Sequence, residues 1–439
     1  MVGLSERWRV GQGLRAGSRC QIRYVVRMVS LTEARRLILD MVEPLDPVAC
    51  FLSDAHGRRL QQTVKAPEDQ PPFDRSAMDG YAIGLQDKAE RFRIVGVVEP
   101  GDGEAFKVAA GECARIFTGA RLPAGLSKVI PQEQASVEGE WMRPLVRSDE
   151  TWVRHRGEDA CAGDVLLKPG VSIGAGEVAL LASVGVVYPV VSQRPTVVHI
   201  TTGNELVDPA VTPKLGQIRD SNAVLIAALV RQYGAVVSRH SRAGDSLEAL
   251  VGAVLAANAQ PWQVLLISGG ASVGDFDFGV RALELLGFEI HFRRINLRPG
   301  KPLVFGTRGK QLAFVIPGNP LSHFVTFHLA IELALHALTD GMMDPRCASL
   351  AEQCLRLPLD ASIPLKPDSR ETWCPANVFV KNAELRARPL PWNSSGDLRG
   401  MLEANALVRL PSGGGSVAAG SLVECLLLTV RQSFSESCV

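Results

Sequence analysis

Polar, charged and glycine-rich segments follow short apolar runs at five places in this 439-residue chain. TGNEL follows the run at 196–201, RAGD follows the run at 235–240, and SGGASVGDFD begins at the end of the run at 263–268. NLRPGKP and PGNPLS follow the runs at 288–295 and 311–316. Carboxylates in these segments could bind Mg²⁺, while guanidinium, ammonium and backbone N–H groups could bind phosphate or another oxyanion.

The segment SGGASVGDFD, residues 268–277, is a candidate phosphate-binding loop. Its glycines allow backbone N–H groups to face a phosphate at the N-terminus of a helix. A tight strand-to-helix turn without a ligand explains the same pattern. The acidic residues that end the segment favour the phosphate-binding interpretation.

Three carboxylates, Glu205, Asp245 and Asp277, form a candidate magnesium site. Mg²⁺ prefers oxygen ligands and keeps several waters, so carboxylates beside a phosphate suit it. Solvated loop acids and helix caps are the alternative. Asp245 directly precedes SLEAL and fits an N-cap and a metal ligand equally well, whereas no helix start accounts for Glu205.

Three cations, Arg294, Arg298 and Lys301, lie in or beside the segment NLRPGKP. Guanidinium forks and an ammonium group suit a phosphate or a tetrahedral oxyanion. A single lysine on a surface is usually only solvated, so the clustering of the three cations carries this interpretation. We therefore expect Lys301 and its neighbours to form an anion-binding edge.

A second polar patch lies earlier in the chain, in PPFDRSAMDGYAI at 71–83. This loop is too polar for a core strand, although Asp79 beside Gly80 is also typical of a simple turn. Thr118 in FTGARLPAG, with Glu158 and Asp159 in RHRGEDA, extends the patch.

The apolar runs and the patterns between them predict the elements that position these side chains. Runs at 196–201, 235–240, 263–268, 288–295 and 311–316 alternate with helical patterns that begin at 222 and 246, which is typical of a parallel sheet with crossover helices. Ligands of such sheets bind beyond the carboxyl ends of the strands. We therefore assign residues 194–341 to a central, doubly wound α/β domain with a ligand site at one rim.

The rest of the chain predicts a multidomain α/β plus β architecture. Ser30 and Glu33 form a capping-box pattern before a helix over 30–42, which we expect to pack beside a second helix, EVALLASVG. The expected domains are a helical linker domain (29–60 and 151–193), an inserted β-rich domain (61–150) and a C-terminal β-barrel-like or sandwich domain (345–439). Residues 1–28 form a disordered or mis-started extension, with Met28 as a possible start and a transit peptide as the alternative.

Composition limits the class of protein. The 47 Lys and Arg residues balance 46 Asp and Glu residues, which argues against a nucleic-acid binder that relies on overall charge. The nine cysteines contain no CxxC pair. No run approaches the about 18 apolar residues of a membrane span. We expect a soluble, cytoplasmic protein with reduced thiols.

Seven segments taken together resemble one family, the molybdopterin molybdenumtransferases, which include bacterial enzymes and the E domain of gephyrin. The segments are PFDRSAMDGYA, FTGARLPAG, RGEDACAG, TTGNEL, SGGASVGDFD, RPGKPLVFG and PGNPLS, and the collinear similarity covers residues 29–439. The resemblance implies a central α/β domain that binds the pterin. It also implies an elongated homodimer whose active cleft combines the α/β domain of one subunit with the inserted domain of the other.

The resemblance further implies a reaction. Members of the family bind adenylylated molybdopterin with a divalent cation, here Mg²⁺, accept molybdate, hydrolyse the phosphoanhydride and release AMP. A molybdopterin adenylyltransferase would be the upstream partner. The implied catalytic residues are Asp79, Asp159, Glu205, Asp245, Asp277 and Lys301, with Glu205 and Asp277 as metal ligands. The implied ligand-binding residues are Thr118, Thr202, Gly203, Asp220, Ser268, Gly269, Gly270, Ser272, Gly274, Arg298, Pro317, Asn319, Ser322, Arg370 and Ser395.

This chain also departs from the family pattern at three positions. Arg298 stands where the family usually has lysine, Pro375 replaces the last arginine of a Gly-Arg-x-x-Phe-x-Arg segment, and Gly400 replaces a common serine. The nucleotide-binding half is therefore better preserved than the molybdate-binding half. A divergent pterin-binding or scaffolding paralogue without activity, and an enzyme that loads tungstate, are the alternatives.

Overall fold

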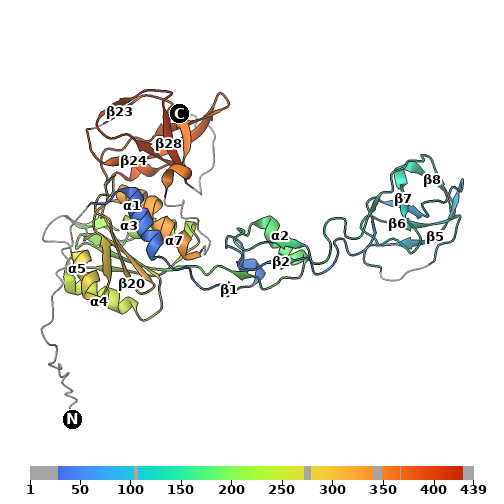
Figure 1. Ribbon diagram of the computed structural model, residues 1–439, viewed down its shortest axis with the longest axis horizontal. Coiled ribbons are helices and arrows are strands. Elements are labelled where there is room, and N and C mark those ends of the chain that lie inside the picture. The colour runs from blue at the N-terminus through green and yellow to red at the C-terminus, as the bar shows by residue number, and fades with distance from the viewer. Residues whose placement is uncertain (1–27, 103–106, 271–277, 340–348, 366, 429–439) are drawn as a thin grey trace, which may run out of the picture. The chain divides into compact units, whose positions relative to one another are not determined.

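The computed structural model describes residues 28–102, 107–270, 278–339, 349–365 and 367–428 (Figure 1). The chain divides into two compact units. Unit 1 contains residues up to 42, residues 196–334 and residues from 344 onward, and unit 2 contains residues 43–195 and 335–343. Each unit is described by itself. The predicted extension before Met28 lies outside the described residues.

A six-stranded sheet forms the centre of unit 1. Its order is β16 (Val236–Ala243), β13 (Thr196–Thr202), β17 (Val264–Ser268), β21 (Gln311–Ile316), β20 (Val304–Arg308) and β18 (Glu289–Phe292). The first four strands are parallel, and β20 is antiparallel to both β21 and β18. The five predicted strands therefore run in one direction and end at one rim. The sequence reasoning missed β20.

Helices cover both faces of this sheet, as the alternation of side chains along the strands requires. Val198 and Ile200 of β13 pack with α4 (Leu247–Ala257) and α5 (Phe278–Leu285), which lie together on one side of the sheet in Figure 1. His199 points to the other face, which is covered by α3 (Ser221–Gln232) and α6 (Pro320–Thr326). This second face carries buried polar residues.

The first helix, α1 (Leu31–Met41), begins at the predicted cap, where Ser30 Oγ accepts a hydrogen bond from Glu33 N at 3.1 Å. It packs in unit 1 against the π-helical turn at Phe327–Ile331, where buried Arg35 donates to Leu329 O at 2.6 Å. The second helix, α2 (Ala175–Ser183), belongs to unit 2. The expected pair of these helices is therefore wrong, because the buried face of α1 is matched to the apolar 327–331 turn.

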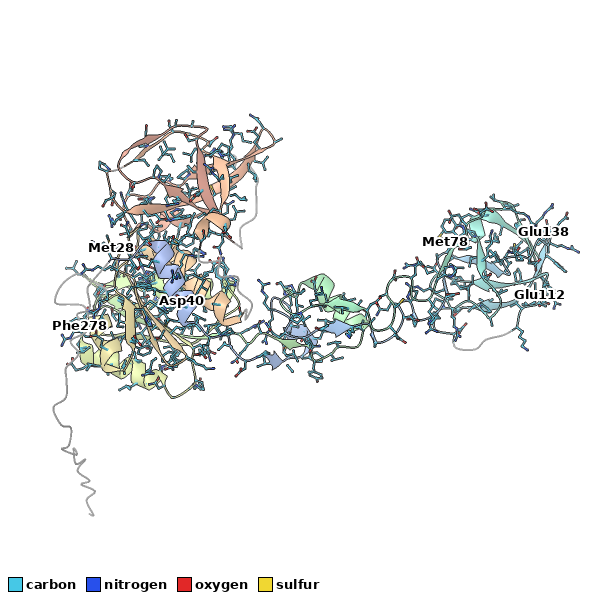
Figure 2. The ribbon with its side chains drawn as sticks, viewed as in Figure 1. Met28, Asp40, Met78, Glu112, Glu138 and Phe278 are labelled. Atoms are coloured by element: carbon cyan, nitrogen blue, oxygen red, sulfur yellow. The ribbon has the colours of Figure 1, made fainter. Side chains whose placement is uncertain are left out.

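Unit 2 contains a β-rich domain and a run of short strand pairs. The β-rich sheet has the order β7 (Lys128–Pro131), β4 (Gly80–Ile83), β6 (Glu112–Ile116), β5 (Phe92–Val98), β9 (Trp141–Pro144) and β8 (Ala135–Glu138). Met78, Glu112 and Glu138 mark this domain in Figure 2. The short pairs are β1 (Val48–Ala49) with β12 (Val190–Val191), β2 (Val64–Lys65) with β11 (Val165–Leu167), and β3 (Arg75–Ser76) with β10 (Val153–Arg154).

The C-terminal part of unit 1 is a small ring of antiparallel strands. The order is β25 (Glu384–Pro389), β24 (Glu371–Lys381), β26 (Ala406–Leu410), β28 (Leu422–Leu427) and β22 (Leu355–Pro358). A bridge from Leu359 to Ala387 links the last strand back to the first. A side pair joins β23 (Ile363–Leu365) to β27 (Gly415–Val417). The start of β24 also pairs with β19 (Leu297–Arg298), which lies in the chain between β18 and β20 of the central sheet.

One helical stretch within the described ranges, Pro320–Thr339, is long and apolar enough to cross a membrane by length and composition alone. It comprises α6, the π-helical turn and α7 (Glu332–Thr339). Of its most apolar window, 89% is buried inside the protein. Such burial is the environment of a core helix.

Candidate ligand-binding site

The loops after β13 and β16 are joined by a reciprocal pair of hydrogen bonds. Asp245 Oδ2 accepts from Asn204 N at 3.0 Å, and Asn204 Oδ1 accepts from Asp245 N at 3.3 Å. The cap of α4 is instead Ser246, whose hydroxyl accepts from Ala249 N at 3.1 Å. The N-cap alternative for Asp245 is therefore wrong. Asp245 is exposed and holds the neighbouring loop in place.

Close approach at this rim requires glycine at two positions. Gly203 has a φ of +148°, and a Cβ there would lie 2.7 Å from Oε2 of Glu205, whose carboxylate folds over it. Gly269 has a φ of +92°, and a Cβ there would lie 2.5 Å from Thr202 Oγ1. Without side chains at these glycines, the loops after β13 and β17 bring backbone and polar groups close together. Glu205 itself is exposed.

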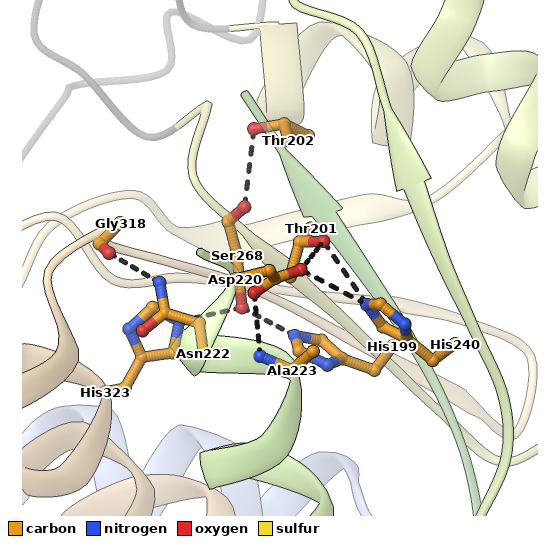
Figure 3. Close-up of polar contacts among 10 residues, drawn as sticks. All are labelled: His199, Thr201, Thr202, Asp220, Asn222, Ala223, His240, Ser268, Gly318 and His323. Atoms are coloured by element: carbon orange, nitrogen blue, oxygen red, sulfur yellow. Dashed lines mark hydrogen bonds and ion pairs between the residues drawn. The ribbon is translucent and has the colours of Figure 1, made fainter. Parts of the chain in front are cut away.

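The hydroxyl of Ser268 faces the interior of the domain (Figure 3). It lies 2.6 Å from Nε2 of His199 and 2.7 Å from Nε2 of His323. Burial lowers the pKa of His323 to about 4, so this ring is neutral near pH 7. Its Nδ1 lies 3.0 Å from Asn319 O, a carbonyl that can only accept.

The tautomers follow from these contacts. His323 carries its proton on Nδ1, so its Nε2 accepts from Ser268, whose hydroxyl in turn accepts from His199 Nε2. The pKa of His199 is held well below its usual value. Burial is the larger cause, and the nearby His323 adds to it. The Ser268 side chain is therefore engaged inside the domain, where it fixes the end of β17, and does not reach a ligand at the rim.

Asp220 also has an interior role. Its carboxylate caps α3 by accepting from Ala223 N at 3.0 Å, and it accepts the hydroxyl proton of Thr201 at 2.7 Å. The ring of His240 lies 3.7 Å from the same carboxylate (Figure 3). Because Asp220 is only 2% exposed, it positions the first turn of α3.

The loop before α6 meets the C-terminal part of unit 1. Asn319 Nδ2 donates to Ser395 Oγ at 2.7 Å, and Leu321 N donates to Ser395 O at 3.0 Å. Two residues predicted to bind ligand thus lie in direct contact although they are far apart in sequence. Pro317 and Ser322, which flank this loop, are buried.

A cluster of charges lies where β19 pairs with β24. Arg370 binds Asp368 through two parallel contacts, Nε to Oδ1 at 2.9 Å and Nη2 to Oδ2 at 2.7 Å. Arg298 Nη1 approaches Asp368 Oδ2 at 3.4 Å. Hydrogen bonds from Arg370 hold the pKa of Asp368 far below its usual value. Among the described residues, no hydrogen bond or ion pair reaches the Lys301 ammonium.

A cavity of about 440 Å³ lies beside this cluster. The cavity is lined by residues of the charge cluster and of the C-terminal part of unit 1, among them Arg298, Asp368, Thr372, Arg388, Leu390 and Trp392. Pro375 is buried within β24 and supplies no charge. A Cβ at Gly400 would lie 2.7 Å from Cβ of Trp392, so a serine at this position would not fit beside the tryptophan as placed.

The second polar patch lies in unit 2. Asp79 Oδ1 accepts from Thr118 N at 2.8 Å and from Thr118 Oγ1 at 2.7 Å. Both hydrogen bonds lower the pKa of Asp79, and the bond from the Thr118 backbone has the larger effect. Asp159 is exposed and paired with Arg154. Met78, which is labelled in Figure 2, directly precedes Asp79 in this segment.

Three of the predicted residues belong to the loop after β17. Ser272, Gly274 and Asp277 lie outside the described residues. Within the described part, no three His, Cys, Asp or Glu side chains form a metal-binding group. Sequence reasoning missed Asn204, His323 and Asp368. Of these, only Asp368 had a usable signal in the sequence. An aspartate two residues before an arginine can bind that guanidinium through both carboxylate oxygens, as Asp368 binds Arg370.

Three family models match the chain in order. They are described as the MoeA N-terminal region (domain I and II), matching residues 29–185, a probable molybdopterin binding domain, matching 199–337, and the MoeA C-terminal region (domain IV), matching 356–428. Together they span most of the described chain.

Individual relatives agree with these matches. A molybdopterin molybdenumtransferase of Bacillus subtilis is 31% identical over 86% of this chain and 89% of its own length. One from Nostoc is 31% identical over 92% and 94%. A solved structure of a molybdopterin biosynthesis moeA protein from Pyrococcus horikoshii OT3 matches with a TM-score of 0.71 at 26% identity, covering 91% of this chain and all of that one. The chain therefore belongs to the molybdopterin molybdenumtransferase family.

Proposed function

We propose that this chain inserts molybdate into adenylylated molybdopterin, in a magnesium-dependent reaction that hydrolyses the phosphoanhydride and releases AMP. The observation that carries the proposal is the rim of the central sheet. There, exposed Glu205 and Asp245 lie on the joined loops after β13 and β16, beside the glycine backbone that follows β17. The family adds the identity of the substrates.

The rim fits Mg²⁺ by the chemistry of its donors. Glu205 presents a carboxylate to solvent, and Asp245 holds the loop that carries it. Mg²⁺ commonly uses one or two carboxylates together with waters and phosphate oxygens. When bound, the cation would neutralise the pyrophosphate charge and orient an attacking oxygen.

The chain's own groups have the following roles in the proposal. The backbone N–H group of Gly270 binds a phosphate oxygen at the end of β17, because that of Gly269 already donates to Ile316 O at 3.0 Å. Lys301 and Arg298 neutralise the charge of the oxyanion. These roles require only positioning and electrostatic stabilisation, so no covalent nucleophile is needed.

We further propose that the active form is a homodimer whose site takes Asp79, Thr118 and Asp159 from the second subunit. This assignment is supported by the separation of the two polar patches into different units. The required upstream reaction adenylylates molybdopterin. The cytoplasm is the compartment we assign, in keeping with the six described cysteines, which are all free thiols.

The test is release of AMP from adenylylated molybdopterin by purified protein with Mg²⁺, with and without molybdate. We expect molybdate-dependent release that EDTA stops and that E205Q abolishes. The control E248Q changes an exposed acid in the first turn of α4 and should keep full activity. Binding of the pterin without AMP release would refute the enzymatic proposal and favour a non-catalytic paralogue. Competition between tungstate and molybdate decides the preferred metal.

A further inference from the structure

Two guanidinium groups in unit 1 share a single carboxylate. Both oxygens of Asp368 are engaged by Arg370, and Arg370 N also donates to Oδ1 at 3.0 Å. Arg298 completes the cluster from the other side at 3.4 Å. The Asp368 side chain is only 15% exposed, so the carboxylate is held inside the cluster and is not a mobile surface group.

The main chain at Arg298 and next to Arg370 is placed by strand pairing, in addition to the contacts with Asp368. Pairing of β19 with β24 places Arg298 opposite Thr372. The Arg298 guanidinium also lies 5.6 Å from the ring centroid of Trp392. Arg370 directly precedes β24. The positive pair is therefore built into the strand register, and removal of the carboxylate would leave its backbone framework in place.

Two guanidinium groups around one small anion are the arrangement that suits a tetrahedral oxyanion. The neighbouring cavity of about 440 Å³ gives access, because Arg298 and Asp368 both line it. A carboxylate of the same chain already occupies this position. A second anion must therefore share or displace Asp368, since like charges at close range repel.

We propose that Asp368 is an internal competitor that sets the affinity and selectivity of the Arg298–Arg370 pair for oxyanions. A tetrahedral dianion such as molybdate binds by taking one or both guanidinium groups from Asp368. Monoanions such as chloride or acetate bring too little charge to do so, and the pair excludes them. This inference deepens the proposed function and rests on it only for the identity of the oxyanion.

The experiment is calorimetric titration of the full chain with sodium molybdate, without pterin, for wild type, D368N and D397N. D397N is the matched control, because Asp397 also binds the arginine two residues later, with Oδ1 3.1 Å from Arg399 Nε. It makes the same change in charge but frees only one exposed guanidinium. We expect D368N to bind molybdate about tenfold more tightly or better, since a charge-assisted hydrogen bond is worth roughly that factor.

D397N should stay within about twofold of wild type, as expected for an exposed pair. D368N should also gain measurable acetate binding. Equal or weaker molybdate binding by D368N would overturn the proposal and make Asp368 a scaffold for the arginines. D368E, which keeps the charge, should bind as weakly as wild type and provides a second test if D368N folds poorly. Failure of AMP release would leave these binding results unaffected, so the two proposals fail separately.

Discussion

Asn204 and Asp245 hold each other through two hydrogen bonds, each side chain accepting from the backbone of the other residue at 3.0 Å and 3.3 Å. Their strands, β13 and β16, are parallel neighbours. The contact therefore fixes the loop that carries Glu205 against the start of α4. The sequence alone is consistent with Asp245 as a helix cap or as a metal ligand. In the structure, the Asp245 carboxylate positions the neighbouring loop.

The first prediction separates this positioning role from metal binding. D245A removes the acceptor for Asn204 N and should lower kcat for AMP release about 100-fold, because small displacements of reacting groups carry penalties of that size. D245N keeps an oxygen acceptor and should retain most of the activity. The Mg²⁺ concentration for half-maximal rate should be unchanged in D245N. A large rise in that requirement would instead make Asp245 a metal ligand.

The second prediction concerns the pKa of Asp79. T118V removes the hydroxyl donor but keeps the backbone N–H, which is the larger cause of the lowered pKa. The pKa of Asp79 should therefore rise but stay below its usual 3.8. T118S keeps the hydroxyl and should match wild type. Carboxyl ¹³C titration of labelled protein measures this, and an unchanged pKa in T118V would show that the hydroxyl bond does not form.

Much of unit 1 could be predicted from sequence because its strands are continuous apolar runs that end in polar segments. The strand at 311–316 was placed to the residue. β20 was missed because its run, LVFG, follows a proline-rich loop and reads as part of it. The partner of α1 was missed because an amphipathic pattern shows which face is buried but not what covers it.

The candidate site was predictable only where its chemistry is local. Glu205 and Lys301 stand out from their segments alone. The roles of Asp220 and Ser268 depend on residues from other elements, such as His323, that no spacing reveals. The spacing of Asp368 to Arg370 is a local signal, but its contact with Arg298 depends on a strand pairing that brings Arg298 from another domain. The side chain of a polar residue at a strand end can therefore point into the domain as readily as toward a ligand.

The third prediction concerns pH. The pKa of His323 is lowered to about 4 by burial, so the folded state binds fewer protons than the unfolded state below the usual value of 6.5. The stability from this neutral ring is complete above pH 6.5 and is lost as pH falls toward 4. His323 alone should account for about 2 kcal/mol of the loss between pH 7.5 and 5, to which buried His199 adds in the same direction. Hydrogen exchange of β17 and α6 measures it.

H323Q should reduce this dependence, because glutamine does not titrate in this range. The variant should be less stable than wild type at pH 7.5, since it loses a hydrogen bond to Ser268 or Asn319. Its protection at pH 5 should then approach that of wild type. Parallel pH dependence in the two proteins would show that His323 is not the group responsible.

The last prediction tests whether the active site is shared between subunits. Asp79 and Glu205 belong to different units of the chain, so D79N and E205Q should each abolish AMP release. If the site combines unit 1 of one subunit with unit 2 of its partner, each mixed dimer contains one intact site. Random co-assembly makes half the dimers mixed, so co-expression should restore about a quarter of wild-type activity.

The matched control co-expresses E205Q with D245A. Both changes lie in unit 1, so a mixed dimer then carries one change in each site and no site is intact. Activity should stay near zero in this pair while it returns in the first. If the site is instead built within one chain, neither pair recovers. Activity that returns for D79N with E205Q, but not for E205Q with D245A, would therefore show that the Asp79 patch and the Glu205 rim form one site made by two copies of the chain.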